Sequence, residues 1–96
     1  MKAWELLVEE GKWTQHRYAR DKDGLGCESS SGDACSFCTI GAINRCYGDS
    51  HRWREIVVNL EMTLKDRGLG VCIADWNDAP ERKQSEVVAL LKELDI

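Results

Sequence analysis

The chain has 96 residues, too few for two independently folded cores, so we expect one globular domain spanning residues 1–96. Its hydrophobic fraction of 43% and four tryptophans exclude a disordered chain, because such a sequence can bury enough apolar surface to offset its conformational entropy. A net charge of −4 disfavours generic binding to nucleic-acid phosphates, which requires a basic face, so we expect no nucleic-acid partner.

The chain carries no signal for a membrane or for export. No stretch approaches the roughly 18 apolar residues that cross a bilayer, and residues 1–5 lack the basic start and apolar run of a signal peptide. Five cysteines, an odd number, fit reduced thiols better than a disulfide framework. We therefore expect a cytoplasmic protein with no membrane association and no structural disulfide.

The first third of the chain predicts a helix and then an extended excursion. Ala3, Trp4 and Leu7 have helical spacing, which predicts a helix over residues 3–10 that ends at Gly11. Residues 12–28 are β-prone and contain the tight-turn dipeptide Asp23-Gly24, which indicates a short hairpin or extended segment.

A second helix is predicted over residues 34–47, after a serine-rich loop. Gly41 and Ala42 remove side-chain bulk from the middle of this helix, at a cost in helix propensity. Such a pair predicts that another part of the backbone packs closely against it.

Two further helices follow from apolar spacing. Residues 53–64 form one stripe with Trp53, Ile56, Leu60 and Leu64, and residues 87–94 repeat the pattern after Pro80. Residues 71–74 form a short apolar run that we expect to be buried.

The predicted fold class is mainly α, a compact bundle of about four helices with a short extended or hairpin excursion after the first. The predicted core consists of Trp53, Ile56, Leu60 and Leu64 with Leu7, Val87, Leu91 and Leu94.

The cysteines and histidines are the most conspicuous chemical groups: Cys27, Cys35, Cys38, Cys46, Cys72, His16 and His51. Cys35-x-x-Cys38 has the spacing of half a zinc site, but no second half follows it. On a helix the same pair would also suit two buried thiols on one face, and a redox dithiol would require a preceding strand. We expect no metal and no cofactor, and a zinc-stabilised domain is the alternative.

No catalytic motif is present along the chain: there is no glycine-rich phosphate loop, nucleophile elbow or His-Glu-x-x-His sequence. This absence favours a protein that is not an enzyme. An enzyme that uses Asp78 with His16 or His51, brought together by folding, remains an alternative.

Trp76, Asn77 and Asp78 form the candidate binding site. Asn and Asp side chains commonly accept backbone N–H bonds at a chain reversal or a helix start, and a tryptophan can anchor such a turn on the core. That structural role predicts that Trp76 is buried. The functional alternative is a polar pocket lip with an aromatic platform.

Four segments resemble a known family: Trp13, residues 37–42, residues 76–80 and residues 86–91. Together they are similar to a family of small bacterial and phage proteins classed as a domain of unknown function, over nearly the whole chain. The sharpest features are Cys-x-x-Gly-Ala and Trp-Asn-Asp. The chain departs from the family at Glu81 and Lys83, which leaves Ser85 as a candidate cap of the last helix.

The resemblance implies a fold and a compartment but no activity. The favoured hypothesis is therefore an accessory domain, encoded by a bacterium, a phage or a mobile element, that acts by binding a partner protein and performs no chemistry.

Overall fold

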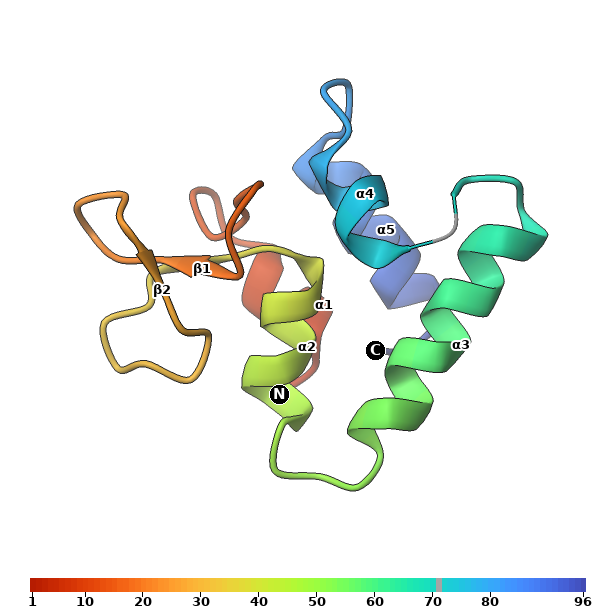
Figure 1. Cartoon of the computed structure of the whole chain (residues 1–96), viewed down its shortest axis with the longest axis horizontal. Coiled ribbons are helices and arrows are strands. Elements are labelled where there is room, and N and C mark those ends of the chain that lie inside the picture. The colour runs from red at the N-terminus through yellow and green to blue at the C-terminus, as the bar shows by residue number, and fades with distance from the viewer. Residues whose placement is uncertain (71) are drawn as a thin grey trace.

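The computed structural model describes residues 1–70 and 72–96 (Figure 1). In this part of the chain the elements are α1 (Ala3–Leu7), β1 (Ala19–Arg20), β2 (Gly26–Cys27), β3 (Ser36–Phe37), α2 (Thr39–Tyr47), α3 (Trp53–Asp66), α4 (Ile73–Asp78) and α5 (Gln84–Glu93).

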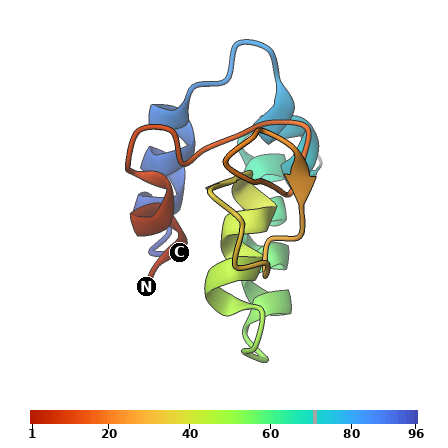
Figure 2. The same ribbon diagram turned by 90° about the vertical axis from the view of Figure 1, so that its left-hand side faces the viewer.

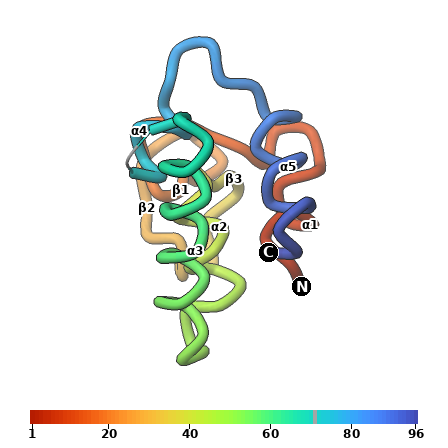
Figure 3. Tube along the Cα trace, turned by 90° about the vertical axis from the view of Figure 1, so that its right-hand side faces the viewer, coloured from red at the N-terminus to blue at the C-terminus, as the bar shows by residue number. Residues whose placement is uncertain are grey.

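Four of the five helices in the described residues lie side by side as two pairs, which contact each other through α1 and α2. Figure 2 shows α1 beside α5, with both chain ends next to this pair, and α2 beside α3. Figure 3 shows the same division from the opposite side, with α4 at one end of α3. The chain ends are joined by a hydrogen bond of 3.1 Å from the Trp4 N–H to the Ile96 carbonyl. Apolar side chains from all five helices meet in one buried cluster.

The predicted core is confirmed in its main features. Six of the eight predicted residues are buried in the cluster: Leu7, Ile56, Leu60, Leu64, Val87 and Leu91. Trp53 and Leu94 are only partly buried and pack against its edge. The apolar stripe therefore identified α3 correctly.

Leu60→Ala is expected to lower the free energy of unfolding by about 2–5 kcal/mol, because it removes a fully buried side chain and leaves a cavity. Val58→Ala is the matched control, since Val58 lies on the same helix and is 45% exposed. Chemical denaturation measures both changes. Equal midpoints for the two variants would show that this face of α3 is not the core.

The predicted helical bundle requires a correction. Five helices, rather than about four, lie in residues 1–70 and 72–96, and they hold less than half of the chain. A small antiparallel sheet of order β2-β1-β3 accompanies them. The excursion after α1 is thus a hairpin of β1 and β2 joined by a turn at Asp21 and Gly24, where Gly24 has φ +81°. A third strand extends it on the other side.

The predicted helix over residues 34–47 was wrong in its first part, and α2 begins only at Thr39. Phe37 instead donates its N–H to the Lys12 carbonyl at 2.7 Å and accepts the Thr14 N–H at 3.0 Å. Its side chain is 2% exposed. Hydrogen bonds to distant segments and burial of the phenyl ring therefore outweigh the local helical tendency.

The other boundaries differ less. α1 ends at Leu7, short of Gly11, and α5 begins after Lys83, so Ser85 lies inside the helix and does not cap it. In the predicted apolar run 71–74, Val71 lies outside the described residues. Ile73 is buried and starts α4.

Candidate functional site

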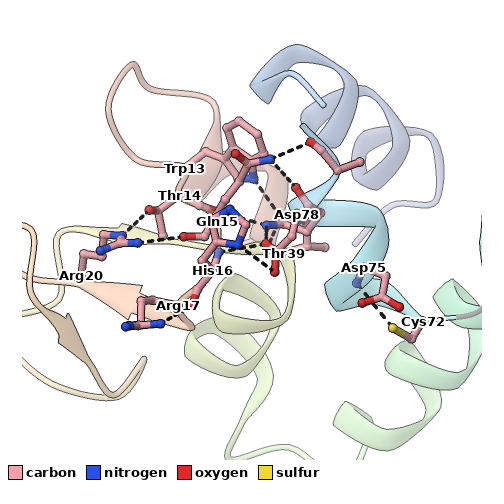
Figure 4. A network of polar contacts seen from close by, with 12 residues as sticks. Trp13, Thr14, Gln15, His16, Arg17, Arg20, Thr39, Cys72, Asp75 and Asp78 are labelled. Atoms are coloured by element: carbon pink, nitrogen blue, oxygen red, sulfur yellow. Dashed lines mark hydrogen bonds and ion pairs between the residues drawn. The ribbon is translucent and has the colours of Figure 1, made fainter. Parts of the chain in front are cut away.

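Asn77, in the last turn of α4, is fully buried and forms hydrogen bonds with several segments of the chain. Figure 4 shows the polar network of this region, with Trp13, Thr39 and Asp78 labelled. Asn77 Oδ1 accepts hydrogen bonds from Trp13 Nε1 at 2.8 Å, from the Thr39 N–H at 2.9 Å and from Thr39 Oγ1 at 2.6 Å. Its Nδ2 donates to the Thr14 carbonyl at 3.1 Å and to Asp78 Oδ1 at 2.9 Å. One amide therefore joins α4 to the start of α2 and to the loop after α1.

Asp78 continues this network to the surface. Its side chain is 30% exposed, and Oδ1 also accepts the His16 N–H at 2.9 Å. The other oxygen, Oδ2, lies 3.8 Å from His16 Nδ1, too far for a hydrogen bond. His16 has φ 71°, a conformation that is uncommon for a residue with a side chain. The carboxylate is thus held through one oxygen, while no hydrogen bond from the described residues reaches the other.

The end of α4 is fixed by two further side chains. Gln15 Nε2 donates to the Asn77 and Ala79 carbonyls, both at 2.9 Å, which satisfies groups that a helix end leaves free. Arg82 Nε donates to the Trp76 carbonyl at 2.9 Å, and its guanidinium lies 4.6 Å from the centre of the indole ring.

The three predicted site residues therefore lie in different environments. Trp76 is 4% exposed and Asn77 is 0% exposed, while Asp78 reaches solvent. The predicted burial of Trp76 is confirmed, and Asn77 and Asp78 do accept backbone N–H bonds, but the predicted donors were wrong. The bonded N–H groups belong to His16 and Thr39, far away in the sequence, and not to the turn or helix that follows.

Asp78→Ala is expected to lower the free energy of unfolding by about 1 kcal/mol, because two donors lose their acceptor. Asp78→Asn is the matched control, since its amide oxygen can keep both hydrogen bonds. Thermal unfolding measures the two shifts. A melting temperature that stays the same in Asp78→Ala would exclude a structural contribution from this side chain.

Cys38 is the N-cap residue of α2 and lies close to the network. Its Sγ accepts the Gly41 N–H at 3.3 Å. Burial raises the pKa of the Cys38 thiol above its ordinary value, and the negative charge of Asp78 raises it further, while N–H groups of Gly41 and Ile40 act in the opposite direction. The net effect favours the neutral thiol.

Gly41 brings the loop at Tyr18 against α2. A Cβ atom at Gly41 would lie 1.9 Å from the Tyr18 carbonyl oxygen, so only glycine fits. The Cys38 N–H donates to the same oxygen at 3.1 Å. The predicted close backbone approach at Gly41 is thus confirmed. It fixes the backbone of Tyr18, although Tyr18 as a whole is 63% exposed.

Two open hollows adjoin at Tyr18 and Ile40, which line both of them. We name each hollow after one of its lining residues, the Asp78 hollow and the Trp53 hollow. The two hollows together are called the groove. The Asp78 hollow, of about 400 Å³, is lined by His16, Arg17, Tyr18, Cys38, Ile40, Ala74 and Asp78. The Trp53 hollow, of about 450 Å³, is lined by Tyr18, Glu28, Ser29, Ser30, Ile40, Asn44, Trp53 and Val57.

The remaining cysteine and histidine candidates are dispersed. Within residues 1–70 and 72–96, no group of three or more His, Cys, Asp or Glu side chains is placed to hold a metal ion. Cys35 is exposed and Cys38 is buried, because the backbone between them is extended and not helical. Of the two histidines considered with Asp78, His16 is the one that forms the pair; His51 lies on the exposed turn between α2 and α3.

Fold and site together define a small α+β domain held together by a buried asparagine, with an open groove on its surface. The chain belongs to DUF6197, a family of unknown function, which it matches over residues 1–94. This membership agrees with the resemblance to a small domain of unknown function. No curated protein and no solved structure matches the chain. Among the described residues, no helix is both long enough and apolar enough to cross a membrane.

Proposed function

We propose that this domain is a non-enzymatic accessory protein of a bacterial or phage-infected cytoplasm, and that it binds a partner protein through the groove. The observation that carries the proposal is the position of Tyr18. This large aromatic residue is 63% exposed at the junction of two hollows, while its backbone is fixed against α2.

A rigidly held tyrosine suits a binding surface. Tyrosine supplies a large contact area with few rotatable bonds, and aromatic residues are enriched among those that dominate binding energy. The neighbouring walls contain Ile40, Trp53 and Val57, so the centre of the groove is apolar, and Glu28 adds a charged group. An apolar centre beside polar groups is the usual arrangement of a protein interface. In this proposal Trp76 and Asn77 contribute by positioning Asp78.

Affinity capture from the native host tests the proposal. Tyr18→Ala is expected to reduce recovery of a specific partner by about tenfold or more, as truncation of a dominant interface residue does. Leu25→Ala is the matched control, because Leu25 is 65% exposed and lies outside the groove. Equal partner recovery with both variants and with the unchanged chain would contradict the proposal.

An enzyme is the second candidate, and one observation favours it. The Asp78 hollow gathers a thiol from Cys38, an imidazole from His16 and a carboxylate from Asp78. Such groups are used in nucleophilic catalysis when a base activates the thiol. The raised pKa of Cys38 is unfavourable for this role, since the thiolate is the reactive form.

Alkylation with iodoacetamide separates the two candidates. Near neutral pH, Cys38 is expected to react much more slowly than the exposed Cys35, because it is buried and its raised pKa keeps it protonated. Its rate should rise only above the ordinary thiol pKa of about 8.5. Peptide mapping by mass spectrometry measures both residues in one sample. Faster labelling of Cys38 than of Cys35 at neutral pH would favour the enzyme.

A further inference from the structure

We infer that the groove binds an extended peptide segment that places a lysine or arginine side chain at Asp78 and an apolar side chain in the Trp53 hollow. This inference rests on the proposed function, because it names the partner chemistry of the same groove.

The first support is the state of the Asp78 carboxylate. Asn77 Nδ2 and the His16 N–H both bind Oδ1, so the carboxylate is oriented before any partner arrives. Oδ2 receives no hydrogen bond from the described residues, and the side chain is 30% exposed. The nearest partner of Oδ2 is the His16 imidazole, whose Nδ1 lies 3.8 Å away, too far for a hydrogen bond. A fixed, partly desolvated carboxylate with one oxygen that accepts no hydrogen bond is suited to a cationic side chain, since charge-assisted hydrogen bonds are stronger than neutral ones.

Arg17 also lines the Asp78 hollow, but within the described residues it forms no ion pair with Asp78. Arg17 Nη1 donates to the His16 carbonyl at 2.9 Å, and the Arg17 side chain packs over Gly26 of β2, where a Cβ atom would lie 2.9 Å from Arg17 Cδ. Figure 4 shows Arg17 on the strand side of the network and Asp78 on the α4 side. The Arg17 side chain is thus engaged away from the Asp78 carboxylate.

The second support is the composition of the Trp53 hollow. Ile40, Trp53 and Val57 form apolar walls of a size that accepts one large side chain. Two of its polar side chains are bonded to each other, since Asn44 Nδ2 donates to Ser29 Oγ at 2.7 Å. Glu28 adds a second carboxylate at this end, which disfavours an acidic partner segment.

The third support is the continuity of the groove. Because Tyr18 and Ile40 line both hollows, a bound group can pass from one to the other over these two residues. An extended peptide presents side chains at regular intervals, so one segment can occupy both hollows. A compact small molecule would occupy only one.

NMR titration of the ¹⁵N-labelled chain tests the inference. The probes are acetylated and amidated peptides that contain one lysine and one leucine separated by glycine spacers of increasing length, with matched peptides in which glutamate replaces the lysine. We expect a lysine peptide to shift resonances near Asp78 and Val57 in a single titration. Asp78→Asn should weaken its binding about tenfold, the loss expected for one charge-assisted hydrogen bond.

Asp75→Asn is the matched control, because Asp75 is exposed on the same helix and does not line the groove. Equal binding of the lysine and glutamate peptides, unchanged affinity in Asp78→Asn, or shifts confined to one hollow would each overturn the inference. If the peptide titration fails in one of these ways but Tyr18→Ala still reduces partner recovery in the capture experiment, only the proposed peptide chemistry is wrong. If Tyr18→Ala also leaves partner recovery unchanged, the proposed function fails as well.

Discussion

Gly41→Ala is expected to lower the free energy of unfolding by about 3 kcal/mol, although alanine is the better helix former. The added methyl group would lie 1.9 Å from the Tyr18 carbonyl oxygen. That oxygen belongs to the backbone and accepts the Cys38 N–H, so no change of side-chain rotamer relieves the contact. The loop at Tyr18 must move away from α2, and the hydrogen bond weakens with it.

Gly32→Ala is the matched control for this experiment. A Cβ atom at Gly32 would have no neighbour within 4 Å, and the backbone there is not in the left-handed region. Its stability should stay within about 0.5 kcal/mol of the unchanged chain. Thermal or chemical unfolding of the two variants measures the difference. Similar melting of Gly41→Ala and Gly32→Ala would contradict the close approach of Tyr18 to α2.

Asn77→Ala is expected to lower the free energy of unfolding by about 4 kcal/mol, because buried donors without an acceptor each cost roughly 1–3 kcal/mol. The lost Oδ1 accepts from Trp13 Nε1, the Thr39 N–H and Thr39 Oγ1. The lost Nδ2 leaves the Thr14 carbonyl without its donor. The substitution thereby removes two of the hydrogen bonds that join the loop after α1 to α4.

Asn59→Ala provides the control, since Asn59 is an exposed asparagine on α3 and its side chain has no hydrogen bond within the described part of the chain. Its effect should stay within about 0.5 kcal/mol, as for other surface positions. Denaturant unfolding of both proteins provides the comparison. A midpoint for Asn77→Ala as high as that of Asn59→Ala would show that the network does not stabilise the fold.

The elements that could be predicted from sequence are those whose residues contact the core at regular spacing. α3 and α5 carry apolar stripes, and both appear where the spacing placed them. The start of α2 could not be predicted in this way. Ser36 and Phe37 are extended because they pair with Ala19 and Arg20, and this pairing depends on residues that are distant in the sequence.

The candidate site was predictable in part for the same reason. Gly41 indicated a close backbone contact, and Asn77 and Asp78 indicated acceptors for backbone N–H groups, because these residue types have few other roles at such positions. The backbone N–H that Asp78 accepts belongs to His16, more than sixty residues away, and the backbone that approaches Gly41 belongs to Tyr18, 23 residues away. Neither partner could be identified from sequence spacing. Tyr18 lies in the β-prone stretch 12–28, and no local pattern there indicates that it lies between two hollows.

In this proposal Asp78 has two separable roles. Oδ1 accepts the hydrogen bonds that hold the fold, and Oδ2, which receives no hydrogen bond from the described residues, binds the partner. Asp78→Asn retains an acceptor at Oδ1 and removes the charge. The most direct test is to measure thermal unfolding and partner recovery on this single variant. We expect a melting temperature close to that of the unchanged chain together with a loss of partner recovery of about tenfold. Full recovery of the partner by a normally folded Asp78→Asn protein would contradict it.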